Sequence, residues 1–110
     1  MKIILAVAVI FAFGALLPVR AADTKENWEK NCAKCHGPDG KGDTKMGQKL
    51  QVRDLTDSKV QSSFTDEKAT KSIKEGVKAE GKSTMPGYAE KLNDDEIKAL
   101  VAYVRGLKKG

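Results

Sequence analysis

The sequence predicts an all-α domain with long loops, and three observations support this fold class. The C-terminal segment repeats apolar residues at helical spacing, and several segments begin with residues that cap helices well. No segment shows the sustained alternation of apolar and polar residues that marks a half-buried strand. Glycine, proline and aspartate gather between the helical segments, which is the composition of turns. At 110 residues, the chain has room for one domain.

The N-terminal segment has the pattern of a secretory signal peptide. Lys2 supplies a positive charge, residues 3–17 form an unbroken apolar run, and small residues up to Ala21 suit a signal peptidase. The alternative to a cleaved signal peptide is a retained membrane anchor. The apolar run argues against an anchor, because it is shorter than the roughly 20 residues of a membrane-spanning helix. We therefore expect cleavage of residues 1–21, a mature domain of residues 22–110, and a periplasmic location without stable membrane insertion.

The charge and composition of the mature chain limit its possible partners. The formal net charge of the full sequence is +5, and it falls to +3 without Lys2 and Arg20. Lysines are mixed with carboxylates rather than forming a basic stripe, so we expect no nucleic-acid partner. The few aromatic and branched apolar residues give a thin core for so short a chain, and a large apolar cofactor would add packing surface.

The first mature segment is predicted to be a helix followed by turns. Asp23 can cap a helix that runs to about Lys34, with Trp28 and Cys32 on one face. Residues 36–55 begin with Gly, Pro and Asp at high density and continue with polar residues. We expect turns throughout that segment.

Three further helical segments are predicted, the last of them the best defined. Residues 57–63 favour a short helical piece, and Thr65 caps a longer helix that Gly76 ends. Asn93, followed three residues later by Glu96, forms a capping box at the start of the last helix. The apolar stripe of this last helix consists of Ile97, Leu100, Val101, Val104 and Leu107.

The segment Cys32-Ala33-Lys34-Cys35-His36 is the clearest chemical motif, and it contains the only cysteines and the only histidine of the chain. Two cysteines three residues apart at a helix end place both sulfurs on one side. There they can add to neighbouring vinyl groups of one porphyrin. The adjacent histidine can then bind the iron. We expect one haem c, attached covalently through Cys32 and Cys35, with His36 as an axial ligand.

Other kinds of site also use paired cysteines. A structural zinc site needs four protein ligands, and the chain offers no second pair of cysteines or histidines. A redox-active dithiol is expected in a βαβ context, which the sequence lacks, while a plain disulfide suits an oxidising compartment. The predicted export leader and the adjacent histidine favour haem over these alternatives.

The mature chain offers Met46 and Met85 as a second axial ligand. Met85 lies in a predicted loop, residues 78–91, and Pro86 restricts its backbone, so the thioether loses less entropy when it is held in place. Met46 has nothing to anchor it and is expected to be an exposed loop residue. Because methionine opposite histidine suits electron transfer, we expect His36 and Met85 as the iron ligands. An open iron position would instead suit a gas sensor.

With these residues, the chain resembles the class I cytochromes c, and specifically the small bacterial monohaem carriers. The resemblance covers the mature chain and is carried by residues 32–42, Arg53-Asp54-Leu55-Thr56, Met85-Pro86, Leu100 and Tyr103. It implies the class I cytochrome c fold, in which the first and last helices pack together beside one covalently bound haem. Each of these helices contributes an aromatic residue to their contact, here Trp28 and Tyr103.

The resemblance also implies roles for two residues and shows two departures. Leu55 is expected to pack on the haem edge, and Arg53 either pairs with a propionate or lies in solvent. Many family members have a proline whose carbonyl accepts the histidine ring proton, but here only Pro38 is near. Thr24 stands where a glycine often lets the two helices approach closely.

Taken together, the motifs and the resemblance predict a monomeric one-electron carrier. No pair of titratable side chains resembles an acid–base or nucleophilic arrangement, so we expect no enzymatic activity. The expected partners are redox proteins, either membrane complexes or reductases and oxidases. The alternative is a haem c subunit of a larger oxidoreductase complex. The candidate residues for the docking surface are Lys41, Lys45, Lys49 and Lys82.

Overall fold

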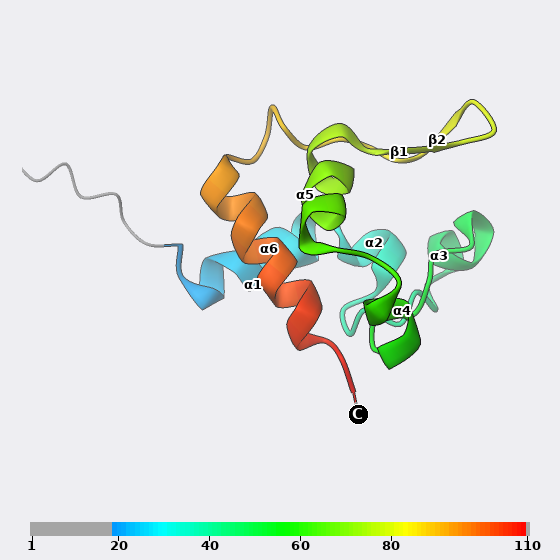
Figure 1. Cartoon of the computed structure of the whole chain (residues 1–110), viewed down its shortest axis with the longest axis horizontal. Helices are drawn as coiled ribbons and strands as arrows, with labels where there is room; N and C mark the ends of the chain where they lie inside the picture. The colour runs from blue at the N-terminus through cyan, green and yellow to red at the C-terminus, as the bar shows by residue number, and fades with distance from the viewer. Residues whose placement is uncertain (1–18, 110) are drawn as a thin grey trace, which may run out of the picture.

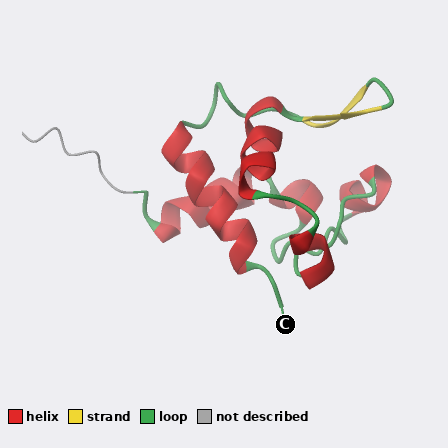
Figure 2. Ribbon diagram, viewed as in Figure 1, coloured by secondary structure: helices red, strands yellow, loops and turns green. Residues whose placement is uncertain are grey.

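The computed structural model describes residues 19–109, which are mostly helical as predicted (Figures 1 and 2). In chain order the elements are α1 (Ala21–Asn31), α2 (Ala33–His36), α3 (Lys45–Leu50), α4 (Ser58–Ser62), α5 (Asp66–Glu75), β1 (Val77–Ala79), β2 (Lys82–Met85) and α6 (Asp94–Gly106). Within this range no helix is long and apolar enough to cross a membrane. Residues 1–18 of the predicted signal peptide lie outside the described residues, and its cleavage site stays a prediction.

The core lies where α6 packs against both α1 and α5 (Figure 1). Ile97 and Leu100 of α6 are each 1 % exposed, and Trp28 of α1 is 2 % exposed. The predicted stripe is confirmed, since its first four residues are buried and Leu107 packs against them. Thr24 is buried in α1, and its hydroxyl donates a hydrogen bond to the Arg20 carbonyl (3.2 Å).

Side-chain caps set the start of three helices, and two of these caps, Thr65 and Asn93, are those that the sequence predicts. Asp57 caps α4, and Thr65 accepts the backbone N–H of Lys68 at the start of α5. Asn93 and Glu96 form the complete predicted capping box of α6. Each such bond satisfies a backbone N–H that has no partner within its helix, which is why short polar residues mark these boundaries.

The predicted cap of the first helix is wrong. α1 begins at Ala21, with Arg20 as the N-cap residue and no side-chain capping bond. Asp23 lies inside the first turn, where a carboxylate still interacts favourably with the positive end of the helix dipole. The helix also ends earlier than predicted, because Cys32 breaks it and α2 begins one residue later.

Two segments predicted as loops contain regular structure. In the first, Thr44 caps α3 by accepting the backbone N–H of Gly47. In the second, β1 and β2 form an antiparallel hairpin that extends away from the helices (Figures 1 and 2). Its turn residues Glu80 and Gly81 have φ values of 52° and 76°, which suit a two-residue hairpin turn. The strands are short and largely exposed, so no alternating pattern predicts them.

A buried polar cluster joins α4 to α6. The Gln61 side-chain amide, in a residue only 4 % exposed, donates to the carbonyls of Leu55 (2.6 Å) and Val104 (2.8 Å). Arg105 donates to the Gln61 carbonyl at 2.6 Å, and its guanidinium lies 4.4 Å from the centroid of the Phe64 ring. The cluster therefore holds the segment around Leu55 against the end of α6.

Candidate functional site

The predicted attachment residues lie at the junction of α1 and α2. Cys32 is the residue between the two helices and is 9 % exposed, while Cys35 and His36 belong to α2 and are partly exposed. The backbone N–H groups of Cys35 and His36 both donate to the Cys32 carbonyl, at 3.2 and 2.9 Å. One short helical turn thus carries both cysteines and the histidine.

The two cysteines are free thiols, and the surroundings of Cys32 do not activate it. Burial raises the pKa of Cys32 to about 11, and the nearby charge of Cys35 adds to the effect. A redox-active dithiol needs a thiolate with a lowered pKa. The environment of Cys32 therefore argues against a redox-active dithiol. The same environment is compatible with a thiol that stays protonated until it is attached to a cofactor.

His36 is half-buried in the attachment turn, and one of its ring nitrogens makes no hydrogen bond. Its Nδ1 is the one side-chain nitrogen or oxygen in residues 19–109 that is buried without a hydrogen bond. Leaving such a group unpaired costs about 1–3 kcal/mol. Burial also lowers the pKa of His36, which favours the neutral imidazole that binds metals. Neither Pro38 nor another described residue accepts a proton from Nδ1.

The backbone around Cys35 is held by the chain that follows it. The Thr44 hydroxyl donates to the Cys35 carbonyl at 2.8 Å, and the same hydroxyl oxygen accepts the N–H of Gly47. Gly47 packs so closely on the Cys35 carbonyl that an added Cβ would overlap it. Gly42 donates its N–H to the His36 carbonyl at 2.8 Å. These contacts fix the orientation of α2.

Trp28 connects the attachment turn to the last helix. Its ring centroid lies 5.7 Å from that of His36 and 5.3 Å from that of Tyr103 on α6. Its indole N–H donates to the Gly37 carbonyl at 3.1 Å in a buried position. The aromatic contact between the first and last helices that the resemblance implies is therefore confirmed, and the hydrogen bond to Gly37 adds a contact that the sequence does not reveal.

Met85 lies at the end of β2 and packs, partly buried, against the core cluster that contains Cys32. Gly76 faces it with φ +82°, and an added Cβ there would lie 2.5 Å from the Met85 carbonyl. The Met85 backbone is therefore closely packed, as expected for a residue held in place. Met46 lies on α3 and is half-buried, so its prediction as an exposed loop residue is wrong, but it is outside the described core cluster.

The residues that follow the attachment loop have other partners. Arg53 is exposed and donates to the Ser63 hydroxyl at 3.0 Å, and Leu55 packs against the core cluster. The Asp54 carboxylate accepts the hydroxyl and the N–H of Thr56, at 2.6 and 2.8 Å. These two hydrogen bonds lower the pKa of Asp54. The pairing of Arg53 with a propionate stays a prediction.

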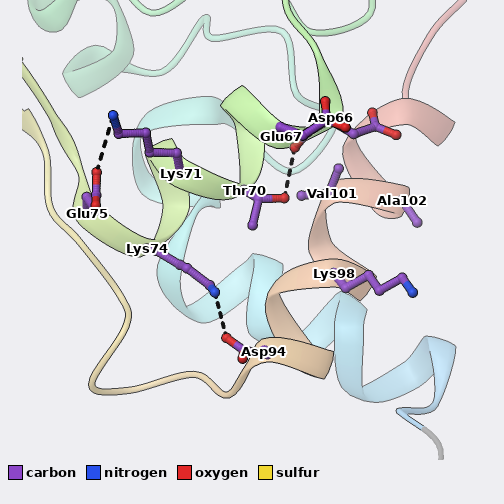
Figure 3. Close-up of a pocket in the computed structure, with 10 residues that line it drawn as sticks. All are labelled: Asp66, Glu67, Thr70, Lys71, Lys74, Glu75, Asp94, Lys98, Val101 and Ala102. Atoms are coloured by element: carbon purple, nitrogen blue, oxygen red, sulfur yellow. Dashed lines mark hydrogen bonds and ion pairs between the residues drawn. The ribbon is translucent and has the colours of Figure 1, made fainter.

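An open groove lies between α5 and α6, and its lining is mostly charged (Figure 3). Lys74 and Asp94 form an ion pair across it at 2.7 Å, and Lys71 lies 3.9 Å from Glu75 on the same helix. None of the predicted ligands lines the groove. Exposed ion pairs of this kind contribute roughly 0–1 kcal/mol, so the groove is a solvated seam between two packed helices.

Comparison with known proteins identifies related chains. Residues 19–104 match the family described as cytochrome c oxidase, cbb3-type, subunit III. The chain is 31% identical to cytochrome c-553 of Helicobacter pylori over 108 residues, which cover 97% of this chain and 98% of that protein. It is 32% identical over 93 residues to the cbb3-type cytochrome c oxidase subunit FixPc of Rhizobium leguminosarum bv. viciae.

The two FixP-type matches and a structural match differ in how much of each protein they cover. The FixPc match covers 84% of this chain but only 30% of FixPc. The match to FixP of Bradyrhizobium diazoefficiens covers 31% of that FixP. The chain therefore spans about a third of the length of these two relatives. Among solved structures, the c-type cytochrome KustC0563 is similar with a TM-score of 0.70 and 36% identity. That match covers 78% of this chain and 98% of the other.

Proposed function

The chain belongs to the cytochrome c family, in the group described as cbb3-type oxidase subunit III, and from this we propose that it is a monohaem electron carrier. Its helices have the class I cytochrome c fold, with a small hairpin added. The observation that carries the proposal is the single turn that holds two free thiols and the imidazole of His36.

The residues of the site fit haem c, the cofactor of this family. Cys32 and Cys35 would hold it covalently, and His36 and Met85 would bind its iron. Haem c supplies reversible one-electron chemistry when it is bound. The polypeptide binds the cofactor and orients its ligands. Trp28 packs on the His36 ring and on α6, which limits the motion of His36. A ligand set that stays in place when the charge changes suits fast electron exchange.

Two relatives bear on whether the chain acts alone. The match to cytochrome c-553 extends over 98% of that protein, which supports a free carrier. The match to FixPc extends over 30% of that protein, which supports the alternative of a haem c subunit in an oxidase complex. We favour the monomeric carrier without bond-making activity, exchanging electrons with membrane or periplasmic redox proteins. The signal-peptide pattern of residues 1–21 supports a periplasmic location.

The proposal is tested by producing the chain with the cytochrome c maturation machinery. We expect a protein whose mass includes one haem that survives denaturation, with residues 1–21 removed. A redox titration should follow a reversible one-electron curve, and gel filtration should show a monomer. A protein without covalent haem would contradict the whole proposal, whereas tight association with one large partner complex would favour the subunit alternative.

The charge of the docking surface gives a separate prediction. Lys45 and Lys49 lie four residues apart on α3, where both are exposed on one face. We expect the rate of electron exchange with anionic hexacyanoferrate to fall about tenfold on raising the ionic strength from ~10 mM to ~500 mM. Replacing both residues with glutamate should lower the low-salt rate more than two glutamates placed at Lys98 and Lys108. Electron-exchange rates that do not change with ionic strength would rule out electrostatic steering by these lysines.

A further inference from the structure

We infer that Tyr88 is a positioning residue whose hydroxyl ties the Met85 segment to the turn that carries the haem attachment site. The inference rests on the proposed ligand role of Met85. The Tyr88 hydroxyl donates a hydrogen bond of 2.8 Å to the Asn31 carbonyl, across 57 residues of sequence. Asn31 is the last residue of α1 and directly precedes Cys32. The bond therefore joins the backbone beside one attachment residue to a side chain three residues after the proposed ligand.

The break at Cys32 explains why the Asn31 carbonyl is available. In a continuous helix, this carbonyl would accept the N–H of Cys35, four residues later. Instead, Cys35 and His36 both donate to the Cys32 carbonyl. An unpaired carbonyl at a partly buried helix end is costly, and Tyr88 supplies a donor from elsewhere in the fold.

Tyr88 is itself fixed on both sides, so its hydroxyl bond is not an accidental surface contact. The residue is 9 % exposed, and its N–H donates to the Ile73 carbonyl at the end of α5 at 2.8 Å. Its carbonyl accepts the N–H of Leu92 at 2.9 Å. Burial raises the pKa of Tyr88, so the hydroxyl keeps its proton and stays a donor.

The backbone between Met85 and Tyr88 has little conformational freedom. Pro86 has a fixed φ and restricts the backbone of Met85 before it. Gly87 packs against α5, where an added Cβ would lie 2.7 Å from the Lys74 carbonyl. A shift at Tyr88 is therefore passed to Met85 rather than absorbed between them. The hydroxyl bond thus fixes where the thioether lies relative to the attachment turn.

The test compares two holoprotein variants that each lose one hydroxyl. Tyr88→Phe removes the bond to Asn31 and keeps the ring, whereas Thr70→Val removes a hydroxyl bond of the same 2.8 Å length to the Asp66 carbonyl on α5. Carbon monoxide can bind the reduced iron only after the thioether leaves. Its apparent affinity therefore reports the fraction of protein with Met85 detached. We expect Tyr88→Phe to raise that affinity about fivefold, because one hydrogen bond changes an equilibrium by roughly that factor.

Two further measurements separate positioning from general stability. Urea unfolding should show similar, small losses for both variants, and the amide protons of residues 88–89 should exchange faster only in Tyr88→Phe. The oxidised wild type should show a near-red charge-transfer band from the Met85 sulfur to the iron. If it does, and both variants keep the wild-type affinity for carbon monoxide, the inference is wrong. If the wild type itself lacks that band, the Met85 ligand proposal fails instead. Equal gains in affinity for both variants would also overturn the inference.

Discussion

Replacing Met85 with alanine will remove the near-red sulfur-to-iron charge-transfer band of the oxidised protein and lower its reduction potential. The band requires a thioether on the iron, and a thioether favours the reduced state, so its loss shifts the potential downwards. The reduced variant will also bind carbon monoxide at least about tenfold more tightly, because no internal ligand competes for the position. Visible spectra, a redox titration and a carbon monoxide titration measure the three effects.

Met46→Ala is the matched control, since both residues are methionines with partly buried side chains. Met46 lies on α3 and outside the core cluster that includes Cys32, whereas Met85 packs against that cluster. We expect Met46→Ala to keep the band, the potential and the low affinity for carbon monoxide. A band that survives in Met85→Ala and disappears in Met46→Ala would reverse the assignment of the ligand.

The parts of the fold that the sequence predicts well are those set by local chemistry. The caps Thr65 and Asn93 act on backbone N–H groups within their own helix, so their neighbours in sequence are enough to identify them. The stripe of α6 is likewise a property of one helix. The spacing of Cys32, Cys35 and His36 identifies the attachment turn because three residues in five carry the chemistry.

The parts of the structure that the sequence does not predict depend on contacts between distant segments. The break between α1 and α2 leaves the Asn31 carbonyl without a partner in its own helix, and Tyr88, 57 residues away in sequence, donates to it. No residue near Cys32 in sequence predicts that partner. Gln61 is buried because Arg105 and the Leu55 and Val104 carbonyls surround it, although glutamine is usually exposed. The sequence does not predict the hairpin for a different reason. Its strands bury little, so the hydrophobic pattern carries no strand signal.

These distant contacts explain how a thin core can still position a site. The attachment turn is reached by three side chains from other elements: Thr44 on Cys35, Trp28 on Gly37 and Tyr88 on Asn31. Each bonds to a backbone carbonyl rather than to another side chain. The chain thereby fixes the orientation of the turn with few residues, and the largest of these three side chains carries most of the packing.

Trp28→Ala will therefore give the largest loss of stability of any single substitution considered for this protein. Trp28 is 2 % exposed, and it contacts both the His36 ring and Tyr103. Truncating a buried tryptophan costs about 3–5 kcal/mol, a large share of the roughly 5–15 kcal/mol that stabilises a domain. Urea unfolding of the holoprotein measures the loss, and Val77→Ala, at a residue 38 % exposed, should change stability by less than about 0.5 kcal/mol.

Trp28→Phe separates the packing of the ring from its hydrogen bond. Phenylalanine keeps an aromatic ring between α1 and α6 but cannot donate to the Gly37 carbonyl, which also accepts the N–H of Gly40 at 3.2 Å. Because that second donor remains, we expect a loss of only about 1–2 kcal/mol. A loss as large as that of Trp28→Ala would mean that the bond to Gly37, and not the packing, is what holds the attachment turn against the last helix.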